Sequence, residues 1–188
     1  MKKHTLNTPR LYLRGFMPQD AGDLLAYLAC PRSNCFLDEK LSSLEAAKQS
    51  IAQRSQDPLQ LALVLKEEQT VIGHVFARKE SPDTYSVGWC LNARYEGKGY
   101  AFEAACAYLS FLFFSQNARR VYAYVQEGNT RSQKLCEKLG FRREGLFKEF
   151  ISFITSPDGS PVYENTLQYA ILKKEWEKIH NMEIAQAE

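Results

Sequence analysis

The amino-acid sequence predicts an α/β domain whose mixed sheet is mostly antiparallel. A strand-like run, 85–91, passes through a glycine turn into a long apolar run, 101–114, and an alternating strand follows at 120–125. Such a strand–helix–strand unit places its two strands parallel. The β-rich runs on both sides of this unit are joined by short turns, which predicts antiparallel hairpins around it.

The N-terminal part of the chain predicts a strand followed by two helices. Residues 11–14 alternate as a strand does, and 18–28 suits a helix with Pro18 near its start and leucines on one face. A second helix is expected from Ser42, since Ser42 and Glu45 have the spacing of a capping box. It should run to about residue 56, where Asp57-Pro58 interrupts it.

Two hairpins are expected in the rest of the chain. Runs 61–66 and 71–78 form the first, with 67–70 as their turn. Runs 141–154 and 162–172 form the last, with a Ser-Pro-Asp-Gly turn at 156–159. We expect one domain over 1–188, with a core at about 5–178 and a frayed polar tail at 180–188.

Composition excludes several function classes. The chain has 188 residues, a net charge of +2 and 45% hydrophobic residues, which fits a compact globular domain. Charges are scattered, so we expect no nucleic-acid partner and no membrane partner. An odd number of cysteines, five, without a secretory signal predicts reduced thiols and a cytoplasmic location. No zinc-type spacing is present, so we expect no metal.

The segment 94–101 carries two glycines, Gly97 and Gly99, at the strand-to-helix turn. Glycines leave backbone N–H groups unshielded, and these groups together with a helix N-terminus suit a phosphate. A Walker loop is disfavoured because Asn92 replaces its first glycine and no hydroxyl residue follows the lysine. A dinucleotide loop is disfavoured because Phe102 replaces its third glycine. A plain strand-to-helix turn is the structural alternative.

The pattern Arg-x-x-Gly-x-Gly resembles the pyrophosphate loop of the GNAT acyltransferase family. A second segment, 129–141, strengthens the resemblance: it reads as a helix capped by Asn129 and closed by Gly140, with Ser132 one turn after the cap. It is similar to the Asn-x-x-Ser and Glu-Lys-x-Gly-Phe hallmark of that family. The opening at 8–14 and the close at 163–172 resemble the RimJ/RimL branch, which modifies ribosomal-protein N-termini. That branch often has Asp where this chain has Asn165.

The resemblance implies a single GNAT-like domain with splayed central strands, and acetyl-CoA as co-substrate. The pantetheine arm would enter between the strands 85–91 and 120–125, where a backbone N–H near Cys90 or Leu91 would polarise the thioester carbonyl. Lys98 would either contact a phosphate or stay in solvent. The full set of expected donor-binding residues is Cys90, Leu91, Arg94, Glu96, Gly97, Lys98, Gly99, Tyr100, Ala101, Asn129 and Ser132.

The catalytic residues are less specified by the resemblance. Many family members carry a tyrosine acid where this chain has Cys136, so Ser132 or a water becomes the candidate proton donor to the CoA thiolate. Ser132 has a local helix cap as its alternative role, and Cys136 is expected to pack. The candidates for the base that deprotonates the amine are Glu103, Glu149, Glu164 and Tyr85, with Glu149 and Glu164 preferred because the last hairpin often borders the acceptor in this family.

These observations predict an acetyl-CoA-dependent N-acetyltransferase that modifies a protein N-terminus or a small amine. The alternatives are a non-catalytic acyl-CoA-binding sensor or scaffold, and, more remotely, a nucleotide-binding module. The acceptor remains open among N-termini, polyamines, amino sugars and antibiotics. Both a monomer and a homodimer are compatible with the sequence.

Overall fold

The computed structural model describes residues 5–179, and the expected frayed tail at 180–188 lies outside the described residues. One sheet of eight strands runs through the described chain, in the order β1-β2-β3-β4-β5-β6-β8-β7. Its strands are β1 (Leu6–Asn7), β2 (Leu11–Arg14), β3 (Leu61–Leu65), β4 (Thr70–Glu80), β5 (Thr84–Leu91), β6 (Arg120–Gln126), β7 (Arg142–Thr155) and β8 (Pro161–Leu172). Only β5 and β6 pair parallel, as the sequence predicts.

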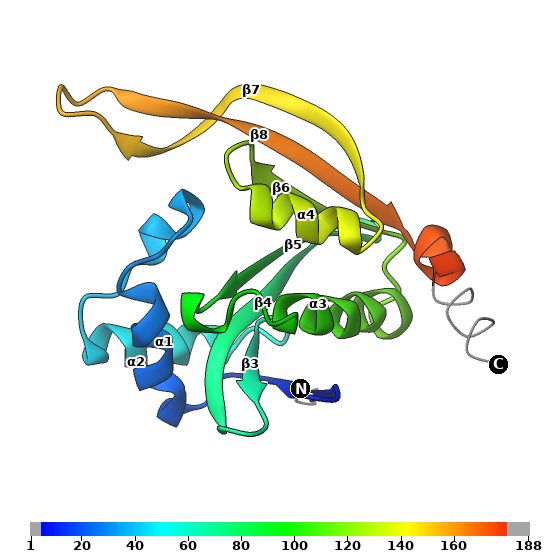
Figure 1. Ribbon diagram of the computed structural model, residues 1–188, viewed down its shortest axis with the longest axis horizontal. Helices are drawn as coiled ribbons and strands as arrows, with labels where there is room; N and C mark the ends of the chain where they lie inside the picture. Colours follow the sequence, from blue (N-terminus) through cyan, green and yellow to red (C-terminus); the bar gives the residue numbers. More distant parts are fainter. Residues whose placement is uncertain (1–4, 180–188) are drawn as a thin grey trace.

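Helices cover both faces of the sheet (Figure 1). The helical elements are η1 (Pro18–Asp20), α1 (Ala21–Leu28), η2 (Asn34–Glu39), α2 (Leu44–Arg54), η3 (Ala93–Tyr95), α3 (Tyr100–Ser110), a π-helical turn η4 (Phe111–Ser115) and α4 (Thr130–Lys138). Residues 173–179 are also helical. Helices α1 and α2 pack on one face, and α3 and α4 pack on the other.

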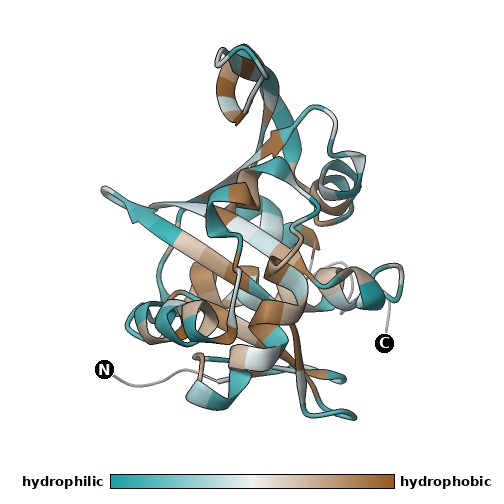
Figure 2. Cartoon of the chain, turned by 90° about the vertical axis from the view of Figure 1, so that its left-hand side faces the viewer, coloured by the Kyte–Doolittle hydropathy of each residue, from teal (hydrophilic) through white to brown (hydrophobic). Residues whose placement is uncertain are grey.

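Strand β3 shows why the sheet lies between two cores. All five of its residues are buried. Leu61, Leu63 and Leu65 belong to the core under α3, while Ala62 and Val64 belong to the core under α1 and α2. Successive side chains of a strand point to opposite faces, so a continuous apolar run fills both layers. Hydrophobic segments lie along the sheet and on the protruding hairpin in Figure 2.

Three details of the predicted helices need correction. The second helix is capped by Ser43, whose side chain accepts from the N–H of Ala46, rather than by Ser42. It ends at Arg54, two residues before the expected end. The apolar run to residue 114 is helical, but its last turn is π-helical rather than α-helical.

The last hairpin is longer than the body of the sheet. Its distal part, residues 147–163, which we call the arm, projects past the remaining strands (Figure 1). The register of β7 against β8 shifts between Phe147 and Ile151, where Glu149 adopts a positive φ of 47°. Such an irregularity bends a strand. In the described part of the chain, no helix is both long and apolar enough to cross a membrane.

Candidate active site

A cleft of about 1660 Å³ opens between the two central strands and extends to the arm. Its walls come from the end of β5 and the following glycine loop, from β6 and the start of α4, and from α1, η2, β4 and the arm. Segments far apart in the sequence therefore meet around one space. The fold brings the two glycine-containing motifs to the same cleft.

Strands β5 and β6 separate along this cleft. Their parallel pairing covers only Thr84–Ser86 against Arg120–Tyr122, and the rest of each strand has no partner in the other. The diverging parts, 87–91 and 123–126, line the cleft. The β6-facing edge of β5 thus offers backbone groups to an extended ligand, as the resemblance implied.

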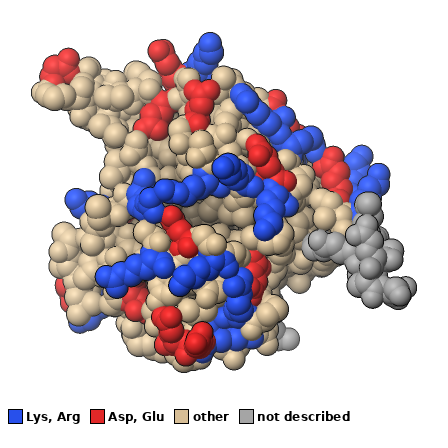
Figure 3. Space-filling model, viewed as in Figure 1, with Lys and Arg blue, Asp and Glu red and all other residues tan. Residues whose placement is uncertain are grey.

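The glycine loop has the backbone shape that an anion site requires. Gly97 and Gly99 have φ values of 76° and 82°, a region that favours glycine. Gly99 is the N-cap of α3 and has no side chain to accept a hydrogen bond. The first N–H groups of the helix therefore have no acceptor within the helix and can bind an anion. The positive end of the helix dipole lies at the same place. Lys and Arg side chains gather in rows over the face that carries α3 and α4 (Figure 3).

Most of the predicted donor-binding residues line the cleft: Cys90, Leu91, Glu96, Gly97, Gly99, Tyr100, Ala101, Asn129 and Ser132. Arg94 and Lys98 do not. The N–H of Arg94 donates to the Asn92 side chain, and the Lys98 ammonium lies 5.7 Å from the centroid of the Tyr95 ring. The structure therefore does not bring these two cations into the cleft.

Asn129 and Ser132 lie together at the start of α4. The side-chain oxygen of Asn129 accepts from the N–H of Ser132 at 3.1 Å, which confirms the predicted cap. Its amide nitrogen donates to Ser33 Oγ at 2.9 Å. Ser132 Oγ accepts from the indole Nε1 of Trp89 at 3.3 Å. A hydroxyl that accepts one bond still has its own proton to donate.

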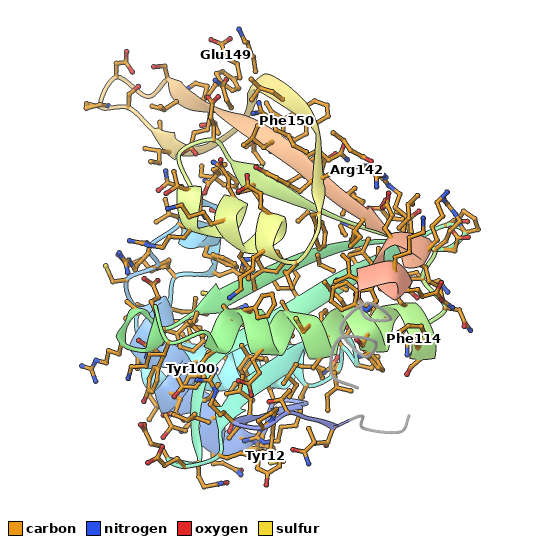
Figure 4. All side chains as sticks on the ribbon, turned by 45° about the vertical axis from the view of Figure 1, so that its right-hand side comes forward. Tyr12, Tyr100, Phe114, Arg142, Glu149 and Phe150 are labelled. Atoms are coloured by element: carbon orange, nitrogen blue, oxygen red, sulfur yellow. The ribbon has the colours of Figure 1, made fainter. Side chains whose placement is uncertain are left out.

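The two preferred base candidates differ in position. Glu164 lines the cleft and accepts from Asn34 Nδ2 at 2.6 Å and from Gln126 Nε2 at 2.9 Å. Glu149 is not among the residues that line the cleft, and it lies at the outer edge of β7, away from α3 (Figure 4). Its N–H donates to Asn165 Oδ1, so the bulge that holds it turns the residue outward. Of these two residues, only Glu164 lines the cleft.

Tyr85 and Glu103, the other base candidates, are held by structural contacts. Tyr85 is buried in the core and its hydroxyl donates to the carbonyl of Gln116 at 3.4 Å. Glu103 accepts from Thr8 and Arg10. Partial burial opposes its ionisation, but these hydrogen bonds outweigh burial and lower the pKa of Glu103. Neither residue lines the cleft.

Burial disfavours the charged forms of two thiols and one imidazole. Cys136 is fully buried, and burial raises its pKa to about 12, which confirms its packing role. Burial likewise raises the pKa of Cys90 to about 12. The buried His74 bonds Tyr27 Oη through Nδ1 at 3.0 Å, and burial lowers the pKa of its imidazole. Within residues 5–179, no group of three or more His, Cys, Asp or Glu could hold a metal ion.

Sequence reasoning missed the residues that cross the cleft. Arg32 binds Glu96 Oε2 at 2.6 Å, and Arg131 lies 3.6 Å from the same oxygen. Asn34 reaches Glu164 across 130 positions of sequence. No local pattern marks contacts of this kind, because each joins residues that are far apart in the sequence and meet only in the folded chain. Of Arg32, Asn34 and Arg131, only Arg131 lies inside one of the two motifs.

A profile described as "Acetyltransferase (GNAT) domain" matches residues 10–142. The chain belongs to the GNAT acetyltransferase family. This match covers the glycine loop and the Asn129 helix, so both features of the cleft fall within the GNAT domain. It also establishes the chain as an acetyltransferase rather than a nucleotide-binding module.

GNAT relatives cover nearly the whole chain. An uncharacterized N-acetyltransferase, YnaD of Bacillus subtilis (strain 168), is 34% identical over 91% of this chain and 98% of its own. The [ribosomal protein uS5]-alanine N-acetyltransferase of Escherichia coli (strain K12) is 29% identical over 40% of this chain and 44% of its own. The crystal structure of a GNAT-family acetyltransferase from Bacillus anthracis has a TM-score of 0.80 at 30% identity, covering 92% of this chain and all of that one. These relatives support the RimJ/RimL-type resemblance.

Proposed function

We propose that this protein transfers an acetyl group from acetyl-CoA to a primary amine by direct attack. The observation that carries the proposal is one cleft that joins the glycine loop and the α3 N-terminus to the Glu164 carboxylate, past the unpaired edge of β5. An anion site, an extended backbone edge and a carboxylate are the three features that this reaction needs.

The donor half of the cleft would hold acetyl-CoA through its phosphates and its pantetheine arm. Backbone N–H groups of Gly97, Gly99 and Ala101 would bind the pyrophosphate, with the α3 dipole adding a favourable field. The open edge of β5 would pair with the pantetheine amides, and Asn129 would add a side-chain contact. A backbone N–H near Cys90 or Leu91 would polarise the thioester carbonyl.

In the reaction the nitrogen must lose two protons and the departing thiolate must gain one. The acceptor arrives as an ammonium ion and must lose one proton before its nitrogen can attack, and Glu164 or a water that it binds would take that proton. The N–C bond forms, the C–S bond breaks, and the nitrogen gives up a second proton. Ser132 would donate its proton to the departing thiolate and be reprotonated by the second proton from the nitrogen, directly or through water. The proton that Glu164 took goes to solvent, so the sum releases one proton.

A non-catalytic acyl-CoA sensor was the alternative, because Cys136 replaces the usual tyrosine and Asn165 the usual acid. Asn165 has a structural role here: its amide donates to Glu127 Oε2 at 2.8 Å and its oxygen holds the β7 bulge. The replacement of the family's usual Asp by Asn165 is therefore no argument against catalysis. A cytoplasmic reaction is part of the proposal, and it fits the five free cysteines.

The test has two parts. Isothermal titration with acetyl-CoA measures donor binding, and release of free CoA in the presence of a panel of primary amines measures transfer. We expect binding in the micromolar range typical of enzymes and amine-dependent CoA release. Binding without amine-dependent release would favour the sensor, while no binding at millimolar acetyl-CoA would remove both readings.

A further inference from the structure

Aromatic side chains line the part of the cleft formed by α1, η2, β4, β8 and the arm. We call this part the acceptor half and define it by Tyr27, Phe36, Phe76, Phe150, Phe153 and Glu164. Its six defining side chains include five rings and one carboxylate. Small-molecule sites of this composition bury an apolar body and orient it through a few polar groups.

The ring of Phe76 forms the floor of the acceptor half. Phe76 lies opposite Gly88 in the β4–β5 register, and a Cβ placed on Gly88 would lie 2.2 Å from Phe76 Cζ. The ring therefore lies directly over the glycine backbone. Phe36 meets it edge-on, with centroids 6.3 Å apart and planes at 86°. These contacts fix an apolar surface before any ligand binds.

The carboxylate of Glu164 accepts hydrogen bonds from two uncharged side chains. Its two oxygens accept from the side-chain amides of Asn34 and Gln126. Among residues 5–179, no lysine, arginine or histidine forms an ion pair with Glu164. The amides orient the carboxylate without cancelling its charge, and each oxygen keeps a lone pair for another donor.

The other carboxylates that line the cleft are already paired. Glu39 binds Arg54, and Glu96 binds Arg32. Arg78, an exposed cation, also lines the cleft and would repel a second positive charge. The acceptor half therefore has room for one cationic group, at Glu164.

We propose that the acceptor is a monocationic primary amine bearing an apolar group, whose ammonium binds Glu164 while the apolar group packs on Phe36 and Phe76. This inference rests on the proposed transfer to an amine and narrows its substrate class. Rings also attract a nearby ammonium through their π faces. Polyamines and amino sugars carry several charges or hydroxyls, which this half of the cleft does not match with partners.

The experiment compares kcat/KM for amines that differ in one property at a time. 2-Phenylethylamine carries the apolar group, methylamine lacks it, and spermidine and kanamycin carry extra charge. A tripeptide with an N-terminal phenylalanine presents the same chemistry from a polypeptide, so its rate relative to 2-phenylethylamine separates the two sources. We expect 2-phenylethylamine or the tripeptide to exceed methylamine at least tenfold, since an apolar contact gives about 10- to 200-fold discrimination.

The outcomes separate this inference from the proposed function. A preference for spermidine or kanamycin, or equal rates with methylamine, overturns the inference and leaves amine transfer standing. No CoA release with any of the amines overturns the proposed function, and the inference falls with it. Acetyl-CoA titration on the same protein shows whether the donor half still binds.

Variants locate the effect. Glu164→Gln should raise KM for 2-phenylethylamine at least tenfold while the Kd for acetyl-CoA stays unchanged. Glu127→Gln is the matched control, because Glu127 also accepts from a neutral amide but does not line the cleft. Phe76→Leu should reduce the preference for 2-phenylethylamine over methylamine, and Phe36→Leu serves if the first variant no longer binds acetyl-CoA. An unchanged preference in a folded variant, or an equal effect of both glutamate variants, overturns the assignment.

Discussion

The indole of Trp89 donates a hydrogen bond to Ser132 Oγ at 3.3 Å, which joins β5 to the start of α4 across the cleft. This bond fixes the serine oxygen at the gap where the two central strands separate. It leaves the hydroxyl proton of Ser132 for another acceptor. The pair therefore fixes the position from which Ser132 would act as the proposed proton donor.

Ser132→Ala should lower kcat by about 10²-fold or more, the lower range for loss of a general acid. The chain offers a close control in Ser110, whose Oγ accepts from the indole of Trp176 at the same 3.3 Å but lies outside the cleft. Ser110→Ala should change stability without a comparable change in kcat. Steady-state CoA release measures both variants, and equal losses in kcat would assign Ser132 a packing role only.

Gly97→Val should abolish most acetyl-CoA binding, because a side chain at this positive φ strains the loop and shields its N–H groups. Gly159 is the matched control: it has a φ of 87° at the tip of the arm, and a Cβ there, as at Gly97, meets nothing within 4 Å. Each of the two substitutions, Gly97→Val and Gly159→Val, should lower the free energy of unfolding by about 1–2 kcal/mol. Calorimetric titration should show weakened acetyl-CoA binding for the first variant alone.

Glu144→Gln should destabilise the protein in a pH-dependent way. Hydrogen bonds from Arg120, and also from Arg142, lower the pKa of Glu144 to about 2, from 4.5. A lowered folded-state pKa adds stability above the unfolded pKa, and this stability is lost as the pH falls toward 2. Urea unfolding should show a gap of about 1 kcal/mol between wild type and variant at pH 7 that narrows below about pH 4.5.

The control for this pH effect is Glu45→Gln. Glu45 forms an ion pair with Lys48 at 3.6 Å, but its side chain is 71% exposed. Its loss should shift stability little at any pH, because solvent screens such a pair. If the difference in free energy of unfolding between wild type and Glu144→Gln stays constant from pH 7 to pH 3, the assigned pKa is contradicted.

Cys90 should resist alkylation at pH 8. Burial raises its pKa to about 12, and the thiolate is the reactive form. Cys30 is exposed and serves as the internal reference. Mass mapping after a short iodoacetamide pulse should find Cys30 modified well before Cys90. Modification of both at similar rates would show that the β5 edge opens in solution.

Local signals in the sequence were sufficient for the main elements. The alternation in β2 and β6, the Asn129 cap and the left-handed Gly140 all depend on residues close in sequence. The prediction of Ser42 as the cap was wrong: Ser42 has the capping-box spacing to Glu45, but serine is favourable as an N-cap at either position, and the helix begins after Ser43. Turn and cap chemistry is local, so these predictions needed no tertiary information.

The sequence by itself determined the GNAT fold, the glycine loop and the Asn129 helix, because each rests on short-range patterns of glycine, polar caps and apolar spacing. Only the tertiary structure decided which carboxylate faces the cleft, since Glu149 and Glu164 lie on the same hairpin and a bulge turns one outward. It also decided that Asn34 and Gln126 hold Glu164. These contacts join residues up to 130 positions apart, and side-chain direction over that separation depends on packing rather than on local sequence.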